Sequence, residues 1–394
     1  MPKLVLNFIC KQEAHVIERM LNSSNGILDL IVAIDTGSTD NTIELIKKYG
    51  ADNNIPTYVF ERPFDTFDKS RNFGMEKVKE VVDELNWDAN DAWMLWYDCD
   101  EQLVIDPKFT KKQFNKDLFM INAKIGQMKY TRNTFCRVSK LVTSLKWTGV
   151  VHEFINAIDT SITSGLAENI EINVSMDGAS WQGDISQKYL DHAHKLEAFI
   201  ATDRTDPRQI FYCAQSYHDA ASMKDNREEN EERLRRSMKY YKERASRTDG
   251  YPEEIYYSQY RVGAIMRMLD EPWHLTHQEL LKAYSIDPLR AESIKTIIDY
   301  YLQMGEWHTA YIYTKFAKMN FHGKSPYPTR LLFIDEATYQ WKIAEAHSAA
   351  CYYTNRLQEA RETFQDILTA TKTHPHCFTP EDLKKIEINS QFFK

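Results

Sequence analysis

The 394-residue sequence lacks the features that mark secreted, membrane-spanning or nucleic-acid-binding chains. No stretch approaches the roughly 18 consecutive apolar residues of a membrane span. The apolar N-terminal run stops at Cys10, which is too short for a secretory signal. Basic residues are not in excess, because 49 Lys and Arg against 57 Asp and Glu give a net charge of −8. That balance disfavours a broad basic surface that binds nucleic acid. Because no apolar stretch is long enough, we also expect no transmembrane segment.

Cysteine is also scarce and shows no metal or disulfide pattern. No two of the six cysteines form a CxxC pair, and none lies with a histidine at zinc-finger spacing. Disulfide frameworks are typical of short secreted chains, so we expect thiols and a reducing, cytoplasmic location. With 43% hydrophobic and 27% charged residues, the composition is that of a well-packed globular protein. The length predicts two or three compact units.

The first half alternates short apolar runs with amphipathic segments. The pattern predicts strands at 3–9, 28–34, 57–60 and 93–96, and helices at 13–22, 41–49 and 69–85. Strand–helix alternation of this kind is typical of βαβ units and of a mostly parallel sheet, so an α/β domain is expected over 1–185. Asn41, with Glu44 three residues later, is expected to cap the second helix. Ligands of such sheets bind at the carboxyl ends of the strands.

From about residue 186 the pattern becomes helical. Only four of the thirteen glycines lie in this half, and long amphipathic stretches are separated by short polar turns. The sequence predicts four helix pairs, 207–224 with 228–246, 253–269 with 273–286, 291–304 with 308–318, and 335–353 with 357–368. Two of the turns, beginning at Asp270 and Gly305, are 35 residues apart, near the period of a tetratricopeptide array. We expect an irregular α-helical, tetratricopeptide-like domain over 186–394, with a plain helical bundle as the alternative.

The sharpest local feature is Asp98-Cys99-Asp100, which follows the apolar run 93–97. In an extended segment residues i and i+2 point to the same side, so both carboxylates can face one ion. Hard oxygen ligands of this kind suit Mg²⁺ or Mn²⁺. Two neighbouring acids are also common on ordinary surfaces. Their position at the end of a predicted buried strand favours a binding site.

Two weaker features lie after other predicted strands. The segment 35–40, Asp-Thr-Gly-Ser-Thr-Asp, contains Gly37, which permits a sharp turn, and polar residues that can cap the following helix. It can equally be a capped turn without a ligand. Arg71 in the predicted third helix is either a surface ion-pair partner or a positioned donor toward a base or phosphate.

Four blocks of sequence, in order, resemble the nucleotide-sugar half of a family 2 glycosyltransferase of the GT-A fold. They are 7–13 (Asn-Phe-Ile-Cys-Lys-Gln-Glu), 32–42 around Asp35, 70–74 (Ser-Arg-Asn-Phe-Gly) and 93–101 around the acidic pair. The segment 146–153, Lys-Trp-Thr-Gly-Val-Val-His-Glu, is similar to the W-x-G-x-V-H-E segment of members that carry tetratricopeptide repeats. Bacterial peptide S-glycosyltransferases share that two-part layout. The resemblance implies a metal-dependent, inverting transfer of a sugar from a nucleoside-diphosphate donor, expected to be a UDP-sugar.

The resemblance also implies a donor-binding set. Asp35 would contact the uracil or ribose, and Arg71 the base side of the pocket; Gly37 and Glu13 complete the set. Many relatives have Asn-Glu after the first strand where this chain has Gln12 and Glu13. The spacer before the acidic pair is extended by 84–91, for which we expect a longer loop.

For the chemistry, the resemblance implies that Asp98 and Asp100 form a DxD signature that binds the divalent metal, Mn²⁺ or Mg²⁺. Asp100 is therefore also a catalytic candidate. His152 would approach the metal or the diphosphate, and Glu153 is the candidate base that takes a proton from the acceptor. If the chain there is extended, the two neighbours point to opposite faces.

The helical half is expected to bind the acceptor, a glycan, peptide or other nucleophile, or to form a homodimer. A sugar-nucleotide nucleotidyltransferase is one alternative, but its glycine-rich loop after the first strand has no counterpart in 7–13. A non-catalytic binding scaffold with a retired transferase domain is another. The presence of Asp98, Asp100 and Arg71 argues against it. A transferase acting on nucleic-acid bases is disfavoured by the acidic balance. The sugar, the acceptor and the stereochemistry are not given by the sequence.

Overall fold

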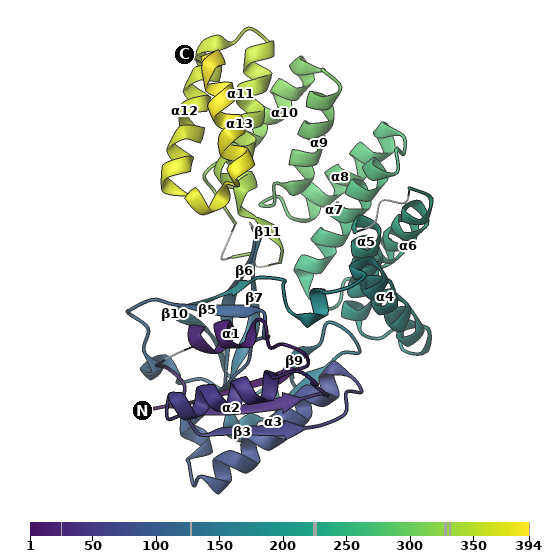
Figure 1. Ribbon diagram of the computed structural model, residues 1–394. Helices are drawn as coiled ribbons and strands as arrows, with labels where there is room; N and C mark the ends of the chain where they lie inside the picture. The colour runs from purple at the N-terminus through teal and green to yellow at the C-terminus, as the bar shows by residue number, and fades with distance from the viewer. Residues whose placement is uncertain (25, 127, 224–226, 327–328, 331, 394) are drawn as a thin grey trace. The chain divides into compact units, whose positions relative to one another are not determined.

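The computed structural model describes residues 1–24, 26–126, 128–223, 227–326, 329–330 and 332–393. Two compact units form (Figure 1): residues 1–126 together with 130–185, and residues 127–129 together with 186–394. The expected order of fold classes, a mostly parallel α/β sheet followed by an all-α part, is confirmed. None of the six cysteines forms a disulfide. No helix among the described residues has both the length and the apolar character needed to cross a membrane.

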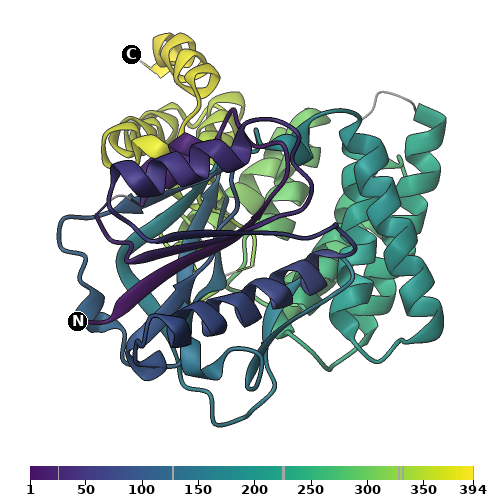
Figure 2. The same ribbon diagram turned by 60° about the horizontal axis from the view of Figure 1, so that its bottom comes forward.

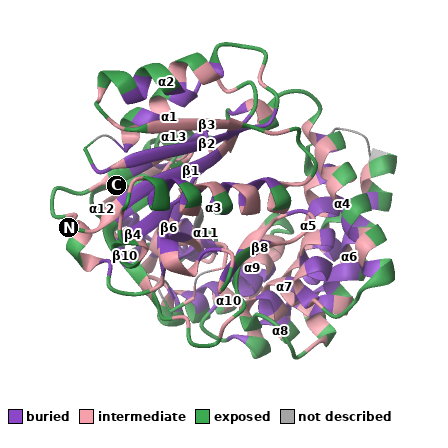
Figure 3. Cartoon of the chain, turned by 90° about the horizontal axis from the view of Figure 1, so that it is seen from below, coloured by how far each residue is buried: buried purple, intermediate pink, exposed green. Residues whose placement is uncertain are grey.

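The sheet of the first unit begins with a parallel set of strands. These are β1 (Lys3–Cys10), β2 (Leu30–Asp35), β3 (Thr57–Glu61) and β4 (Ala92–Leu95). β1 lies between β2 and β4, and β3 pairs with β2, all in parallel register. Every residue of β2 is buried, which explains its continuous apolar sequence (Figure 3).

Further strands extend the sheet beyond β4. They are β5 (Glu101–Ile105), β6 (Leu118–Ile125), β7 (Met128–Arg137) and β10 (Ser164–Val174). The order along the sheet is β3-β2-β1-β4-β7-β6-β10-β5. β7 runs antiparallel to β4, whereas β10 is parallel to β6 and antiparallel to β5. A separate hairpin is made of β8 (Leu145–Thr148) and β9 (Phe154–Ala157).

Helices cover both faces of the parallel strands (Figure 2). Because side chains alternate along a strand, Leu4, Leu6 and Phe8 of β1 join one core cluster with α1 (Ile17–Ser23) and α2 (Thr42–Asp52). Val5 of β1 joins the other cluster, with α3 (Phe67–Glu84). The sheet therefore carries a core on each side, and its strand ends remain available for a site.

The second unit is a succession of antiparallel helix pairs. Its helices are α4 (Ile185–Thr202), α5 (Pro207–Ser222), α6 (Arg227–Ser246), α7 (Pro252–Met268), α8 (Trp273–Ile286), α9 (Glu292–Gln303), α10 (Trp307–Asn320), α11 (Ile343–Tyr353), α12 (Leu357–Thr373) and α13 (Pro380–Ser390). A short strand, β11 (Ile334–Asp335), pairs with Met128 and Lys129. A π-helical turn, η5 (Thr338–Lys342), leads directly into α11. The first three predicted helix pairs are confirmed. In the fourth, the helix predicted over 335–353 is α-helical only from Ile343, because β11 and η5 precede it, and α4 and α13 were not predicted.

Several local predictions differ from the structure. Asn41 makes no side-chain cap; instead the Asp40 carboxylate accepts hydrogen bonds from the backbone N–H and the hydroxyl of Thr42. The first helix begins at Ile17, four residues later than predicted, because 14–16 form a turn. The spacer 84–91 is not a long loop, since α3 runs to Glu84 and a 3-10 turn, η1 (Ala89–Asp91), occupies its end. Residue 224, the predicted end of the helix that begins at 207, lies outside the described residues.

Candidate functional site

The predicted site residues lie at one edge of the sheet. β1 and β2 end side by side at Cys10 and Asp35, which are register partners. The parallel strand β4 lies on the other side of β1 and leads through Trp96 and Tyr97 into Asp98. Since carboxyl ends of parallel strands share an edge, the segments after β1, β2 and β4 form one polar surface there.

Arg71 of α3 connects two of the predicted site residues. Its Nε donates to Glu153 Oε1 and its Nη2 to Asp98 Oδ1, both at 2.7 Å. The guanidinium lies 4.7 Å from the ring centres of Trp96 and Trp147. Burial opposes its charge, but the two carboxylates outweigh that effect and raise the pKa of Arg71. Arg71 is therefore a buried cationic link between Asp98 and Glu153.

Neighbouring contacts hold this arrangement. The Asn72 side-chain amide donates to the Trp147 carbonyl and accepts from the Trp147 N–H, both at 2.9 Å. Glu101 accepts from the Asp98 N–H at 2.8 Å and forms a two-point ion pair with Arg132, whose guanidinium lies 4.2 Å over Trp96. Arg132 was not predicted from the sequence, since it comes from β7 and no motif surrounds it.

Asp100 is the most enclosed acid of the predicted pair, with 8% of the residue exposed. A Cβ atom at Gly178 would lie 3.0 Å from Asp100 Cβ, so this glycine lets the chain close over the carboxylate. Asp100 Oδ2 is buried and has no hydrogen-bond partner among the described residues. Burial, and then the charge of Asp98, raise the pKa of Asp100. A buried, unsatisfied carboxylate oxygen is costly unless a cation or a proton meets it.

Glu13 lies in the same acidic surroundings. Its Oε2 accepts from the Ala179 N–H at 3.1 Å, and its own N–H donates to Thr42 Oγ1 at 2.9 Å. Burial raises the pKa of Glu13 to about 7, with further increases from Asp100 and Asp98. The negative charges of Asp100 and Asp98 therefore act on the Glu13 carboxylate, and that of Asp98 acts on Asp100. Carboxylate oxygens are the donors that Mn²⁺ and Mg²⁺ prefer, but among the described residues Glu13, Asp98 and Asp100 do not form a group whose ligand atoms all lie within 4.8 Å of one another.

Asp35 and Gly37 form the turn after β2. Asp35 is 1% exposed, and its Oδ1 accepts from the N–H groups of Gly37 and Ser38 at 2.9 and 2.8 Å. Gly37 has φ +111°, a conformation that favours glycine. Gln12 accepts from the Thr39 N–H at 2.8 Å and so joins this turn to the segment after β1. Side chains therefore hold this turn as expected, and a donor contact by Asp35 stays a prediction.

His152 and Glu153 lie in the bend between β8 and β9. His152 has φ +54°, so the chain there is left-handed rather than extended, and the condition under which the two neighbours would point to opposite faces is not met. Glu153 is directed to Arg71, with 12% of its side chain exposed. In the described part of the chain, His152, Asp98 and Asp100 do not form a group whose ligand atoms all lie within 4.8 Å of one another. A metal role for His152 stays a prediction.

No protein-family model and no curated sequence matches this chain. Solved structures with a similar arrangement include residues 1–349 of TarS from S. aureus in complex with UDP-GlcNAc, at 12% identity over 72% of this chain and 89% of that chain, with a TM-score of 0.36. MamA aligns at 13% identity over 50% of this chain and 100% of its own, with a TM-score of 0.32. Glucosyl-3-phosphoglycerate synthase from Mycobacterium tuberculosis, solved with Mn²⁺ and UDP, aligns at 16% identity over 32% of this chain and 46% of its own, with a TM-score of 0.21. What this chain does is therefore inferred from its own residues.

Proposed function

We propose that this chain is a metal-dependent glycosyltransferase that moves a sugar from a nucleoside-diphosphate donor, a UDP-sugar, to an acceptor nucleophile with inversion. The observation that supports it most is the buried Asp100 Oδ2 that lacks a hydrogen bond among the described residues. This oxygen lies next to Asp98 at the carboxyl edge of the parallel strands, where such sheets bind ligands. The order of the four sequence blocks supplies the donor class.

Asp98 and Asp100 are the proposed ligands of Mn²⁺ or Mg²⁺, and Glu13 adds negative charge beside them. A divalent ion held there supplies electrostatic stabilisation of the departing diphosphate. The protein holds Asp98 in position before the donor binds. Arg71 donates to its carboxylate and Glu101 accepts from its N–H, so Asp98 does not have to reorient when the donor arrives. Asp35 and Gly37 are proposed to shape the turn on the donor side.

Glu153 is the proposed base. An inverting transfer needs a group that takes the proton from the acceptor as it attacks. Arg71 fixes the position of the Glu153 carboxylate through its Nε. His152 is proposed to face the diphosphate. The helical unit is proposed to bind the acceptor or a second copy of the chain, because stacked helix pairs offer extended surfaces. A cytoplasmic location belongs to the same proposal.

The test measures nucleoside-diphosphate release from a panel of sugar nucleotides with Mn²⁺. We expect the parent chain to hydrolyse one UDP-sugar slowly and Asp100→Asn to lose that activity by at least about 100-fold, as when a charge-stabilising group is removed. The control is Asp52→Asn, an acid at the end of α2 whose side chain is 60% exposed. Equal turnover by the parent and Asp100→Asn would reject the metal assignment. No turnover of any donor by the parent would favour the binding scaffold.

A further inference from the structure

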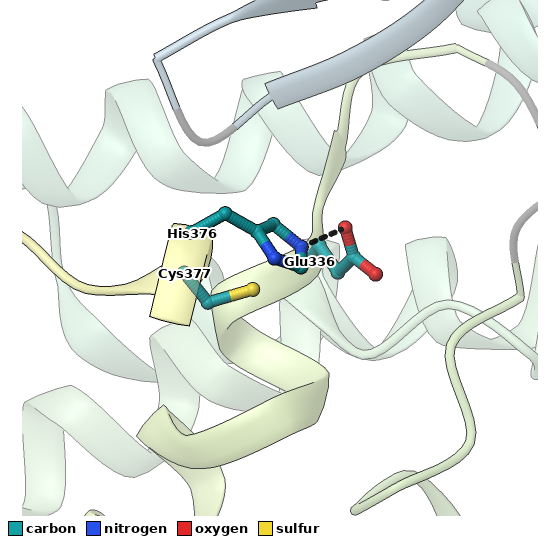
Figure 4. A group of neighbouring side chains, drawn as sticks. All are labelled: Glu336, His376 and Cys377. Atoms are coloured by element: carbon teal, nitrogen blue, oxygen red, sulfur yellow. Dashed lines mark hydrogen bonds and ion pairs between the residues drawn. The ribbon is translucent and has the colours of Figure 1, made fainter. Parts of the chain in front are cut away.

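A second group of metal-ligand side chains lies in the helical unit, remote in sequence from the acidic pair. Glu336 stands between β11 and η5, while His376 and Cys377 lie in a 3-10 turn, η6 (Pro375–Cys377), after α12. One ligand atom from each of the three residues lies within 4.8 Å of the other two. Figure 4 shows the imidazole of His376 facing the carboxylate of Glu336, with the Cys377 side chain beside them.

The spacing of the His376 and Glu336 ligand atoms suits zinc. His376 Nε2 and Glu336 Oε2 are 3.3 Å apart. Two such ligand atoms bound at about 2.0–2.1 Å to a tetrahedral Zn²⁺ ion lie roughly 3.3–3.4 Å from each other. Thiolate, imidazole and carboxylate are all ligands of zinc, and three protein ligands leave the fourth position to water. A hard ion such as Mg²⁺ would not select a thiol.

The surroundings hold the ligands in place and leave an entry path. Trp341 Nε1 donates to the Cys377 carbonyl at 2.9 Å, and the Trp341 ring stacks on Phe378. Cys377 is 1% exposed and belongs to an apolar cluster with Ile386 of α13. The His376 side chain is 36% exposed, so an ion can reach the group from solvent. An apolar shell on one side and an accessible imidazole on the other are what an ion site requires.

A competing group with the same residue types consists of His347, Cys351 and Glu359. Both ring nitrogens of His347 already have partners, Nδ1 with Thr314 Oγ1 at 3.0 Å and Nε2 with Glu359 Oε1 at 3.1 Å. Lys315 Nζ lies 3.7 Å from the same Glu359 oxygen. Both groups contain a hydrogen bond between the imidazole and the carboxylate that an ion would replace, but here the positive charge of Lys315 next to Glu359 opposes a cation.

We propose that one Zn²⁺ ion binds to Glu336, His376 and Cys377. It would connect η6 to the segment that leads into the π-helical turn η5 and α11. Binding takes the proton from the Cys377 thiol, because the thiolate is the ligand. The ion links two segments 40 residues apart, which also meet through an apolar cluster and the hydrogen bond from Trp341 to the Cys377 carbonyl. The bound ion would connect two segments of the helical unit, and its binding does not depend on the proposed transferase activity.

The test uses the full chain freed of metal by a chelator and titrated with Co²⁺ as a spectroscopic substitute. We expect one equivalent of Co²⁺ to produce a thiolate-to-cobalt charge-transfer band, and Zn²⁺ to remove it. The oxygen ligands of Asp98 and Asp100 give no such band, so the two metal sites are separated by the readout. Cys377→Ser should abolish the band, and His376→Gln, at an exposed position, should weaken Co²⁺ binding by roughly tenfold or more.

Cys351→Ser is the matched control, because it alters the same residue type in the competing group. It should leave the band and its titration unchanged. Circular dichroism of each variant shows whether the helices are retained. If Cys377→Ser does not fold, the weaker Co²⁺ binding expected of His376→Gln tests the proposal instead. The absence of a band in the parent chain, its persistence in Cys377→Ser, or its loss in Cys351→Ser would each overturn the proposal.

Discussion

Arg71 illustrates how one side chain sets the geometry of the proposed site. Its guanidinium is charged, buried and paired with Asp98 and Glu153. Arg71→Met removes the cation from Glu153, whose side chain is 12% exposed, and from Asp98, whose side chain is 41% exposed. Loss of one partner from a fully buried ion pair costs about 3–5 kcal/mol, and the exposure of Asp98 places this pair at the lower end, about 3 kcal/mol. We expect a decrease of that size in the free energy of unfolding, measured by chemical denaturation. Lys48→Met, which removes an exposed ion pair with Asp52, should cost less than about 1 kcal/mol. Similar losses in both variants would contradict the burial of the Arg71 pair.

Glu13 predicts a dependence of stability on pH. Its pKa is about 7 in the folded chain against 4.5 for an ordinary glutamate. A raised folded-state pKa gives stability that is fully present below pH 4.5 and is lost as the pH rises through 7. Glu13→Gln cannot ionise and should therefore gain on the parent between pH 5 and 8, by on the order of 1–2 kcal/mol. The difference in unfolding free energy between Glu13→Gln and the parent is measured by thermal unfolding with a chelator present. A difference that does not vary with pH would contradict the raised pKa of Glu13.

At the scale of elements, Glu292 joins three parts of the helical unit. It begins α9 and accepts hydrogen bonds from Arg290, from Tyr256 of α7 and from Tyr339 of η5, at 3.0, 3.1 and 3.1 Å. Glu292→Gln removes the charge that balances the fully buried Arg290, so we expect a loss of about 3–5 kcal/mol in unfolding free energy. Tyr256→Phe removes one hydrogen bond and should cost about 1 kcal/mol. Equal costs in the two variants, measured in urea, would show that the ion pair contributes nothing of its own.

Element types were predictable where a pattern repeats, and their ends were not. Leu30–Asp35 is buried along its whole length, and its continuous apolar run predicted a strand. The cap of α2 was assigned to Asn41, yet Asp40 makes the bonds, because both residue types can cap and the choice depends on how the turn after Asp35 closes. The helix α13 begins with a capping box between Thr379 and Asp382 and with Pro380 in its first turn, a start signal that the sequence carries and the prediction missed. Its apolar face is weak, and Ile386 packs in one cluster with Trp341.

The site was predictable only as a location. The spacing of Asp98 and Asp100 after a buried strand indicated an acidic edge, and the structure has that edge. The partner of Arg71 could not be read from the sequence, because Glu153 is 82 residues away and comes from the bend between β8 and β9. His376 and Cys377 are adjacent in the sequence, but without Glu336, 40 residues earlier, they match no zinc spacing.

At the scale of the whole molecule, the chain consists of two compact units with separate apolar cores. The proposals place one ligand in each: a UDP-sugar with Mn²⁺ at Asp98 and Asp100, and Zn²⁺ at His376 and Cys377. A ligand at 100 times its dissociation constant stabilises the part that binds it by about 2.7 kcal/mol. Hydrogen exchange measured by mass spectrometry resolves where that stabilisation falls.

We expect UDP with Mn²⁺ to slow exchange in core peptides of residues 1–126 and 130–185, and to leave the helices from α5 onward unchanged. Zn²⁺ should do the reverse, with its largest effect in α11 and α13. Asp100→Asn should abolish only the first response, and Cys377→Ser only the second, so each variant is the control for the other. Protection of both units by either ligand would mean that they open as a single cooperative unit. Protection by UDP that survives in Asp100→Asn would place the nucleotide away from the carboxyl edge of the sheet.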